Sequence, residues 1–340
     1  MTEYSDSFII YEGIEFIAVF KKKFLFWKYY VLRVGYLENK DEKSVERVKI
    51  FQKNIDDIPS YLPIPNNRLH ITSPLNKNET KNKPKYIRVY KKPTERISIK
   101  NYSEKGKYEF LRVYTEHYET GGTVGGLFSL SKFPNELFGI SNWHVIKGKS
   151  GKLGDPIYKH YIDSRGRFED KRIVGNLFWA SKFNEIDAAI FHFNFDSIKD
   201  EILKKDILRG VPIINKIGVP EIGKRVLKKG VRTGETEGKI LSDNTTIKFE
   251  IEHGKNKEIK IFRNQIMVEK ISDDGDSGSI LFSEDKKAIG LIFASNNSDS
   301  GQQMSLACNI NDILNRDFKP EHPGYYRKKN ITIKKLILTN

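Results

Sequence analysis

From about residue 108 onward, the chain consists of short runs of β-branched and aromatic residues separated by Gly, Asn and Asp. Alternating runs of this length are typical of strands, whereas helices need apolar residues three and four positions apart. Thirteen short strands are predicted, at residues 110–114, 124–130, 137–146, 156–161, 173–179, 186–193, 225–229, 239–242, 246–251, 265–271, 279–282, 288–294 and 304–310. With almost no helix between them, they predict a mainly β body, either a sandwich or a barrel.

A single helical interval, residues 196–208, falls near the middle of these strands. It would connect two halves of about six strands each, and two β-barrels in tandem are the simplest arrangement of such halves. We therefore predict a first β-barrel over residues 108–195, and a linker helix with a second β-barrel over residues 196–316.

The first 107 residues follow a different pattern. Residues 14–36 read as a hairpin of strands, and residues 44–58 place their apolar residues on one helical face. Further short strands are expected at residues 86–90 and 96–99. This segment is predicted to form a small α+β N-terminal domain.

The net charge of +15 suggests a polyanionic partner, but it is concentrated at the two ends of the chain. Residues 1–110 contain 22 Lys and Arg against 14 Asp and Glu, and residues 318–340 contain 6 against 1. The central part is nearly neutral. We therefore expect a basic N-terminal domain and a basic C-terminal tail over residues 317–340, either of which could recruit a protein partner. Nucleic acid binding is less favoured and stays open.

One cysteine, Cys308, cannot form an internal disulfide, and it argues against a cysteine-based metal site. Neither an HExxH motif nor a pair of acids at metal-ligand spacing occurs, so no metal or cofactor is expected. The sequence shows neither a secretory signal nor an apolar stretch of membrane-spanning length. A cytoplasmic location without membrane association is expected.

The segment Gly275-Asp276-Ser277-Gly278, directly before an apolar strand, combines features needed for acyl transfer. A serine hydroxyl becomes a nucleophile when a base takes its proton, and the resulting oxyanion needs converging backbone N–H groups. Glycine at position 275 permits the backbone conformation in which its N–H and that of Ser277 converge. A Gly/Asp hairpin turn would have the same sequence.

Two further residues could complete such a site. His144 directly follows a strongly apolar stretch, although a buried structural histidine would fit the same pattern. Asp187 lies between Ile186 and an apolar strand, where a carboxylate needs a hydrogen-bonded partner because an isolated buried charge costs several kcal/mol. The N–H group at Nδ1 of a histidine would serve as this partner.

At these residues the sequence resembles the chymotrypsin-like, or trypsin-fold, serine proteases. The resemblance rests on residues 141–146 (SNWHVI), 186–190 (IDAAI) and 275–279 (GDSGS), in the chain order of that family. Residues 122–126 (GTVGG) and 288–294 (AIGLIFA) add weaker similarity, and the sequence looks most like the intracellular trypsin-like peptidases of the Nal1-like type. Coverage runs from about residue 108 to residue 316.

The resemblance implies an intracellular serine endopeptidase acting on protein or peptide substrates. Ser277 would attack the peptide carbonyl, His144 would accept and return the proton, and Asp187 would orient the imidazole. The N–H groups of Gly275 and Ser277 would form the oxyanion hole. The rival interpretation is a catalytically silent trypsin-fold module whose basic ends bind a partner or nucleic acid.

Two departures from secreted members of the family affect activation. Thr123 and Val124 resemble the new N-terminus that activates those members, but His144 follows too soon, so we assign them to a barrel strand. In those members, the aspartate at the position of Asp276 pairs with the released N-terminal amine. In this chain Asp276 needs another partner, which the sequence does not identify.

The substrate pocket is the least readable part of the resemblance. Its base is predicted at Ile271 and its wall at Ser295, which favours a small or apolar side chain at the cleavage position. A shift of one residue in this match would bring Asp273 or Asp274 into the pocket instead.

Overall fold

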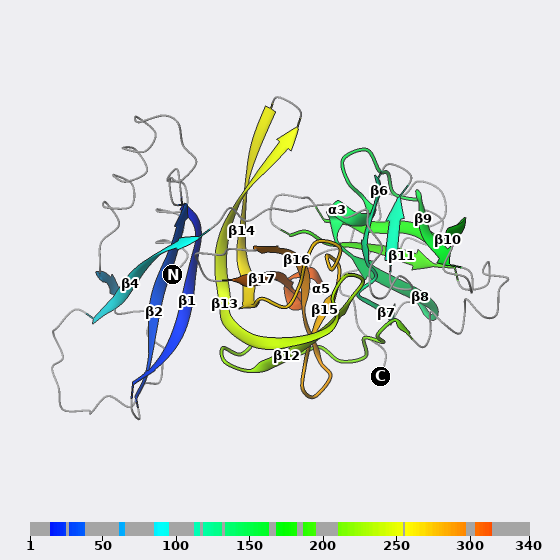
Figure 1. Ribbon diagram of the computed structural model, residues 1–340. Helices are drawn as coiled ribbons and strands as arrows, with labels where there is room; N and C mark the ends of the chain where they lie inside the picture. The colour runs from blue at the N-terminus through cyan, green and yellow to red at the C-terminus, as the bar shows by residue number, and fades with distance from the viewer. Residues whose placement is uncertain are drawn as a thin grey trace.

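The computed structural model describes residues 14–24, 27–37, 61–64, 85–94, 112–115, 118–130, 133–162, 168–181, 186–194, 210–253, 256–296 and 303–314. These residues form two curled sheets that lie side by side (Figure 1). The expected mainly β fold, a chymotrypsin-like double β-barrel, is confirmed. The predicted helices at 44–58 and 196–208, the short strand at 96–99 and the tail at 317–340 lie outside the described residues.

The first barrel is a sheet of seven strands in the order β6-β5-β9-β10-β11-β8-β7. Its strands are β5 (Arg112–Thr115), β6 (Tyr118–Thr123), β7 (Gly126–Leu130), β8 (Phe133–Ser141), β9 (Pro156–Ile162), β10 (Phe168–Ala180) and β11 (Ala189–Phe193). A one-turn helix, α3 (Trp143–Ile146), follows β8. Phe138 and Phe191 come from paired strands and are both completely buried. Phe138 lies opposite His192 and Phe191 opposite Gly139, so the two rings point to opposite faces of the sheet and pack in different hydrophobic clusters.

The second barrel belongs to a sheet of ten strands in the order β12-β15-β16-β17-β14-β13-β1-β2-β4-β3. It closes because β12 also pairs with β13. The barrel strands are β12 (Arg225–Gly230), β13 (Gly234–His253), β14 (Asn256–Glu269), β15 (Ile280–Ser283), β16 (Ala288–Asn296) and β17 (Met304–Asn309), and α5 (Ile310–Leu314) follows β17. The strands outside the barrel are β1 (Ile14–Phe24), β2 (Trp27–Leu37), β3 (Tyr61–Ile64) and β4 (Lys85–Thr94).

Two of the differences between the predicted strands and the structure have a clear physical reason. The strand predicted over 137–146 ends at Ser141, because the carbonyl of Asn142 accepts hydrogen bonds from the N–H groups of Val145 and Ile146 and starts α3. The predicted strands at 239–242 and 246–251 form one continuous strand, β13. Irregular pairing with β14 near Ser242 absorbs the polar residues that resemble a turn.

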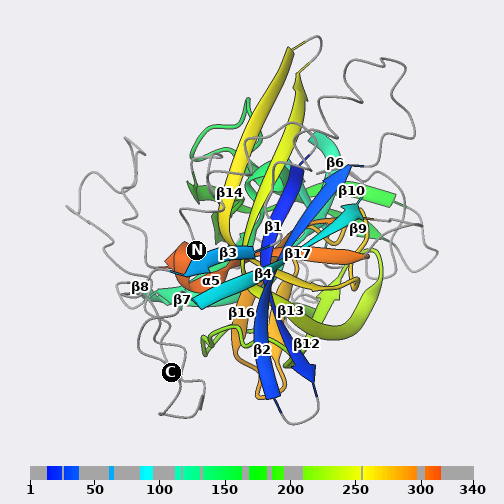
Figure 2. The ribbon, with the colours of Figure 1, turned by 90° about the vertical axis from the view of Figure 1, so that its left-hand side faces the viewer.

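The N-terminal hairpin extends the sheet of the second barrel. β1 pairs with β13, with Phe16 opposite Ile247 and Ala18 opposite Thr245. Figure 2 shows β1 and β2 crossing in front of this sheet. Phe16 is 1% exposed and belongs to the same hydrophobic cluster as Phe249 and Phe293 of the barrel. The hairpin therefore shares a core with the body that it joins.

This shared core predicts that the hairpin contributes to the stability of the second barrel. Replacing Phe16 with alanine should lower the free energy of unfolding by about 3 kcal/mol, because the barrel loses a buried aromatic ring. Ile259→Ala is the matched control, since Ile259 is 63% exposed on β14 and its loss should matter little. Urea unfolding followed by tryptophan fluorescence measures both. Equal small effects would show that the hairpin is not part of the barrel core.

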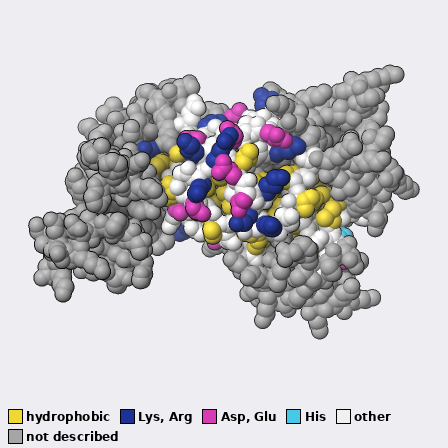
Figure 3. Space-filling model, turned by 90° about the horizontal axis from the view of Figure 1, so that it is seen from below, with side chains coloured by type: hydrophobic (Ala, Val, Ile, Leu, Met, Phe, Trp, Pro, Cys, Tyr) yellow, Lys and Arg dark blue, Asp and Glu magenta, His cyan; other side chains and the backbone are white. Residues whose placement is uncertain are grey.

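Charges on the described surface are mixed in sign. The face in Figure 3 carries Lys and Arg side chains interspersed with Asp and Glu. Ion pairs of this kind include Arg225 with Glu237 and Lys287 with Asp285. Within the described residues, no helix is long and apolar enough to span a lipid bilayer.

Candidate active site

His144 and Asp187 lie at the same end of two neighbouring strands of the first barrel. β8 and β11 pair with Ser141 opposite Ala189, and His144 follows β8 while Asp187 comes just before β11. The backbone N–H of His144 donates to Asp187 Oδ1 at 3.0 Å, and the imidazole Nδ1 forms a short contact with Asp187 Oδ2. Asp187 is completely buried and His144 is 8% exposed. The structure therefore brings these two predicted residues together.

The Asp187 carboxylate fixes which ring nitrogen of His144 is free to act as a base. A carboxylate accepts hydrogen bonds, so Nδ1 carries the proton in the neutral ring and Nε2 keeps its lone pair. Nε2 is buried and has no hydrogen-bond partner among the described residues. Such a nitrogen can accept a proton from a nucleophile, as a general base must.

Two residues that sequence reasoning missed support Asp187 from its backbone. The Asn142 side-chain amide donates to the carbonyl of Asp187 at 2.7 Å, which ties the start of α3 to the strand that carries the acid. The Asp187 N–H donates to the thiol sulfur of Cys308 at 3.4 Å. A polar side chain directly before an apolar helical turn was the only sequence signal for Asn142.

Ser277 lies in the tight turn that precedes β15. Gly275 and Gly278 have φ angles of 103° and 95°, which are accessible to glycine and strained for other residues. The Asp276 N–H donates to the Asp273 carbonyl at 2.9 Å and closes the turn. The predicted Gly-Asp-Ser-Gly turn therefore forms because glycine occupies both positions that need a positive φ.

The turn is joined to the first barrel beside His144. The Thr123 N–H donates to the Ser277 carbonyl at 2.7 Å. A Cβ atom placed on Gly122 would lie 2.7 Å from that carbonyl oxygen and 2.5 Å from a methyl group of Val145. The Ser277 carbonyl and the side chain of the residue after His144 therefore both lie against Gly122, and all three predicted residues come close together where the two barrels meet.

Within the described residues, the Ser277 hydroxyl is not hydrogen-bonded to His144; it donates instead to the Phe293 carbonyl, at 3.4 Å. That distance is at the long end for a hydroxyl donor, so the bond holds the hydroxyl weakly. Hydrogen bonds of catalytic groups are often long before substrate binds and tighten in the complex.

Two backbone N–H groups of the turn can receive an oxyanion. Among the described residues, the N–H groups of Gly275 and Ser277 donate to no partner. The Gly275 carbonyl accepts a hydrogen bond from Thr123 Oγ1 at 2.9 Å, which fixes the peptide group between Gly275 and Asp276. Unpaired N–H groups on a fixed backbone are what stabilisation of a tetrahedral oxyanion requires.

A small hollow opens beside Ser277. Its lining consists of Ser272, Asp273, Asp274, Ser277, Ile292, Phe293, Ala294 and Ser295. Ser295 therefore lies where the sequence placed the pocket wall, and both aspartates named as alternatives also line the hollow. Lys270 forms an ion pair with Asp273 at 2.7 Å and donates to the Ser295 hydroxyl at 3.3 Å. The hollow combines short side chains with two carboxylates.

Ile271 is the one predicted pocket residue that needs correction. Its side chain is 5% exposed and packs with Val226, Ile240 and Val268 in the core of the second barrel. Its carbonyl accepts a hydrogen bond from Thr236 at 2.6 Å. Ile271 follows the end of β14 and its side chain packs inward, and the next two residues, Ser272 and Asp273, line the hollow instead.

Lys228 and Thr123 also belong to the surroundings of Ser277, and sequence reasoning assigned neither of them a role there. Lys228 lies 3.0 Å from the carboxylate of Asp276 and supplies the partner that the sequence left unnamed. Thr123 ends β6, as expected for a barrel strand, whereas Val124, predicted to belong to the same strand, lies between β6 and β7. Within the described residues, no group of three or more His, Cys, Asp or Glu side chains could hold a metal ion.

Comparisons with known proteins identify similar folds. No protein-family model matches the chain, and no curated protein matches it. Among solved structures, a glutamic acid-specific serine protease is 14% identical, with a TM-score of 0.41, and covers 60% of this chain and 94% of its own. The Nocardiopsis protease NAPase is 15% identical, with a TM-score of 0.40, and covers 63% of this chain and 95% of its own.

A third similar structure is Protease A from Thermobifida fusca. It is 13% identical, with a TM-score of 0.39, and covers 59% of this chain and 90% of its own. These neighbours are serine proteases of low sequence identity. The Nal1-like subtype stays a prediction.

Proposed function

We propose that the chain is a serine endopeptidase that hydrolyses peptide bonds in protein substrates through an acyl-enzyme. The observation that carries this proposal is the pair formed by His144 and Asp187, whose unpartnered Nε2 lies where the two barrels meet, beside the Ser277 turn. A buried His–Asp pair could be purely structural. The adjoining serine on a glycine turn with two unpaired N–H groups favours catalysis.

Each group has one task in the proposed reaction. His144 Nε2 takes the proton as Ser277 Oγ attacks the scissile carbonyl, and the Asp187 carboxylate stabilises the imidazolium. The N–H groups of Gly275 and Ser277 donate to the oxyanion of the tetrahedral intermediate. His144 then protonates the leaving amine. Water next attacks the acyl-enzyme while His144 takes its proton, and His144 returns that proton to Ser277 Oγ as the carboxylic acid product leaves.

The intracellular setting, the Nal1-like subtype and recruitment through the basic ends are parts of the same proposal. Cys308 is buried and is the single cysteine of the sequence, which is compatible with a reducing compartment. The proposed reaction needs neither a metal nor a cofactor, because every step uses side chains and backbone groups already named.

A fluorophosphonate probe tests the proposal. We expect the full-length chain to be labelled on Ser277, because the probe reacts with serines that a base activates. Labelling should disappear in Ser277→Ala and persist in Cys308→Ser, which removes the thiol but keeps an acceptor for the Asp187 N–H. Intact-mass measurement shows whether the chain is labelled, and peptide mapping identifies the labelled residue. A folded chain that stays unlabelled over a wide pH range would favour the catalytically silent binding module instead.

A further inference from the structure

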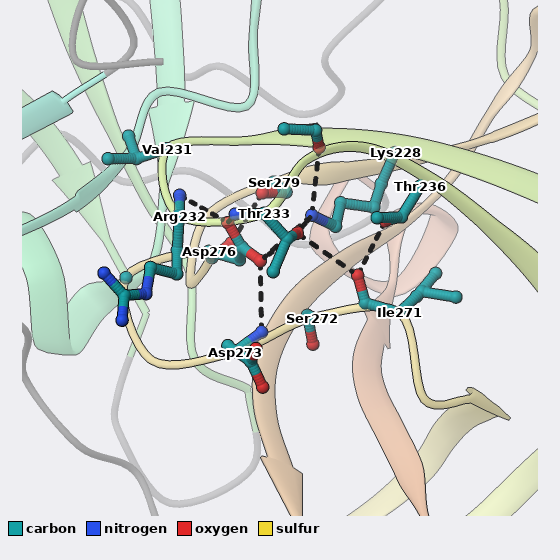
Figure 4. A network of polar contacts seen from close by, with 12 residues as sticks. Lys228, Val231, Arg232, Thr233, Thr236, Ile271, Ser272, Asp273, Asp276 and Ser279 are labelled. Carbon is teal, nitrogen blue, oxygen red and sulfur yellow. Dashed lines mark hydrogen bonds and ion pairs between the residues drawn. The ribbon is translucent and has the colours of Figure 1, made fainter. Parts of the chain in front are cut away.

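Asp276 is a completely buried carboxylate directly before the nucleophile. Its Oδ1 accepts hydrogen bonds from the N–H groups of Arg232 and Thr233, at 2.8 and 3.1 Å. Its Oδ2 accepts from the Thr233 hydroxyl at 2.6 Å, the Asp273 N–H at 3.1 Å and the ammonium group of Lys228 at 3.0 Å. Figure 4 shows these donors converging on the carboxylate from three segments of the chain. So many donors compensate the removal of a charge from water.

Lys228 is buried as completely as its partner. Both side chains of the ion pair have 0% exposure. Burial alternates along β12, so Lys228 points to the same inward side as Val226. Its ammonium also donates to the Gly234 carbonyl at 3.1 Å and contacts the Thr233 hydroxyl. All three N–H groups of the ammonium are thus engaged. These contacts compensate for the burial of the Lys228 charge in the barrel interior.

This network is connected to the backbone groups that catalysis would use. Asp276 lies between Gly275 and Ser277, so a fixed carboxylate restrains the peptide groups on both sides. The Val231 N–H donates to Thr123 Oγ1 at 3.0 Å, and the same hydroxyl donates to the Gly275 carbonyl. The loop between β12 and β13 therefore holds the nucleophile turn through Asp276 and through Thr123.

We propose that Lys228 is a positioning residue which, through Asp276, holds the Gly275–Ser277 turn in its reactive geometry in the uncut chain. The inference rests on the proposed function, and it adds a regulatory consequence. An internal ammonium occupies the place beside Asp276, so the chain does not need a newly released N-terminal amine to become active. Activity would be constitutive with respect to N-terminal cleavage.

The ion pair also gives the proposal a pH signature. Burial lowers the pKa of Lys228, against the opposing effect of the two charged groups that act on it, Asp276 and Asp273. Activity should therefore be present while Lys228 is protonated and decline on the alkaline side as pH rises through its pKa. An arginine keeps its charge throughout this range. Lys228→Arg should move the alkaline decline upward by at least about one pH unit.

The experiment compares full-length chains whose intact N-terminus is verified by mass spectrometry. Lys228→Met should slow fluorophosphonate labelling of Ser277 by about 100-fold or more, because the oxyanion donors lose their position. Hydrogen exchange of the peptide spanning 272–279 should accelerate in this variant. Lys229→Met is the matched control: the next residue on β12 pairs with the exposed Glu235, and its loss should change neither reading.

Each outcome decides one question. Suppose that the wild type is labelled and that Lys228→Met shows the same labelling rate and the same hydrogen exchange. This result would overturn the positioning role of Lys228 and leave the proposed function intact. A wild-type chain that is never labelled would refute the proposed function, while the exchange data would still decide whether Lys228 orders the turn. If Lys228→Met does not fold, the alkaline profile of Lys228→Arg decides: a profile identical to that of the wild type would overturn the proposal.

Discussion

Replacing Asp187 with asparagine should lower kcat by about 10⁴-fold while KM changes little. The two carboxylate oxygens have different partners: Oδ1 accepts from the backbone N–H of His144, and Oδ2 faces the imidazole Nδ1. In the variant, the amide oxygen would keep the bond to the backbone N–H, which would turn the amide NH₂ toward Nδ1. Nδ1 would then have to be the acceptor, the proton would sit on Nε2, and the base would be lost.

Steady-state hydrolysis of a peptide substrate measures this effect, and proteome-wide comparison of new N-termini between the wild type and Ser277→Ala supplies the substrate. Asp285→Asn is the control, because Asp285 is an exposed aspartate whose carboxylate pairs with Lys287 and with no residue of the site. A kcat for Asp187→Asn within tenfold of the wild type would mean that His144 does not act as the base in the state that the structure shows.

The sequence carried most of the information about where the proposed triad residues lie. Each of the three segments combines a polar residue with an apolar strand, and a buried histidine and a buried aspartate each need a hydrogen-bonded partner. Local patterns of this kind report burial and strand position well. They also predicted that the Gly-Asp-Ser-Gly segment would turn, since only glycine relieves the positive φ at 275 and 278.

The partner of Asp276 could not be predicted, because it depends on register. β12 contains adjacent lysines at 228 and 229, and consecutive residues of a strand face opposite sides. Pairing with β15, in which Lys228 lies opposite Leu281, turns the first lysine inward. A slip of one residue would have buried Lys229 instead. The sequence contains both candidates, and only long-range pairing distinguishes them.

The place of the N-terminal hairpin was hidden for a related reason. Residues 14–36 read correctly as two strands, but their pattern does not say which edge they join. β13 is longer than the barrel requires, and its extension offers Thr245–Ile247 as an edge for β1. Pairing between strands more than 200 positions apart leaves no trace in local periodicity.

Gly278→Ala should abolish labelling of Ser277 and lower the free energy of unfolding by about 3 kcal/mol. Gly278 has a φ of 95°, and a Cβ atom at this position would lie 2.1 Å from the Thr123 carbonyl oxygen and 2.5 Å from the Ser141 hydroxyl. Because the atom at 2.1 Å is a backbone oxygen of β6, the new methyl group would fit only if β6 moved. That movement would separate Thr123 from the Ser277 carbonyl and from Gly275, so the turn would lose its support from the first barrel.

Gly223→Ala separates the two causes of this effect. Gly223 has a φ of 86°, and a Cβ atom there would meet nothing within 4 Å. The control therefore carries the backbone strain alone, about 1 kcal/mol, and should be labelled at the wild-type rate. Urea unfolding and the fluorophosphonate labelling rate are measured on both variants. If Gly278→Ala behaves like Gly223→Ala in both measurements, the close approach of β6 to the nucleophile turn does not hold the turn in place, and the contact through Thr123 has no catalytic importance.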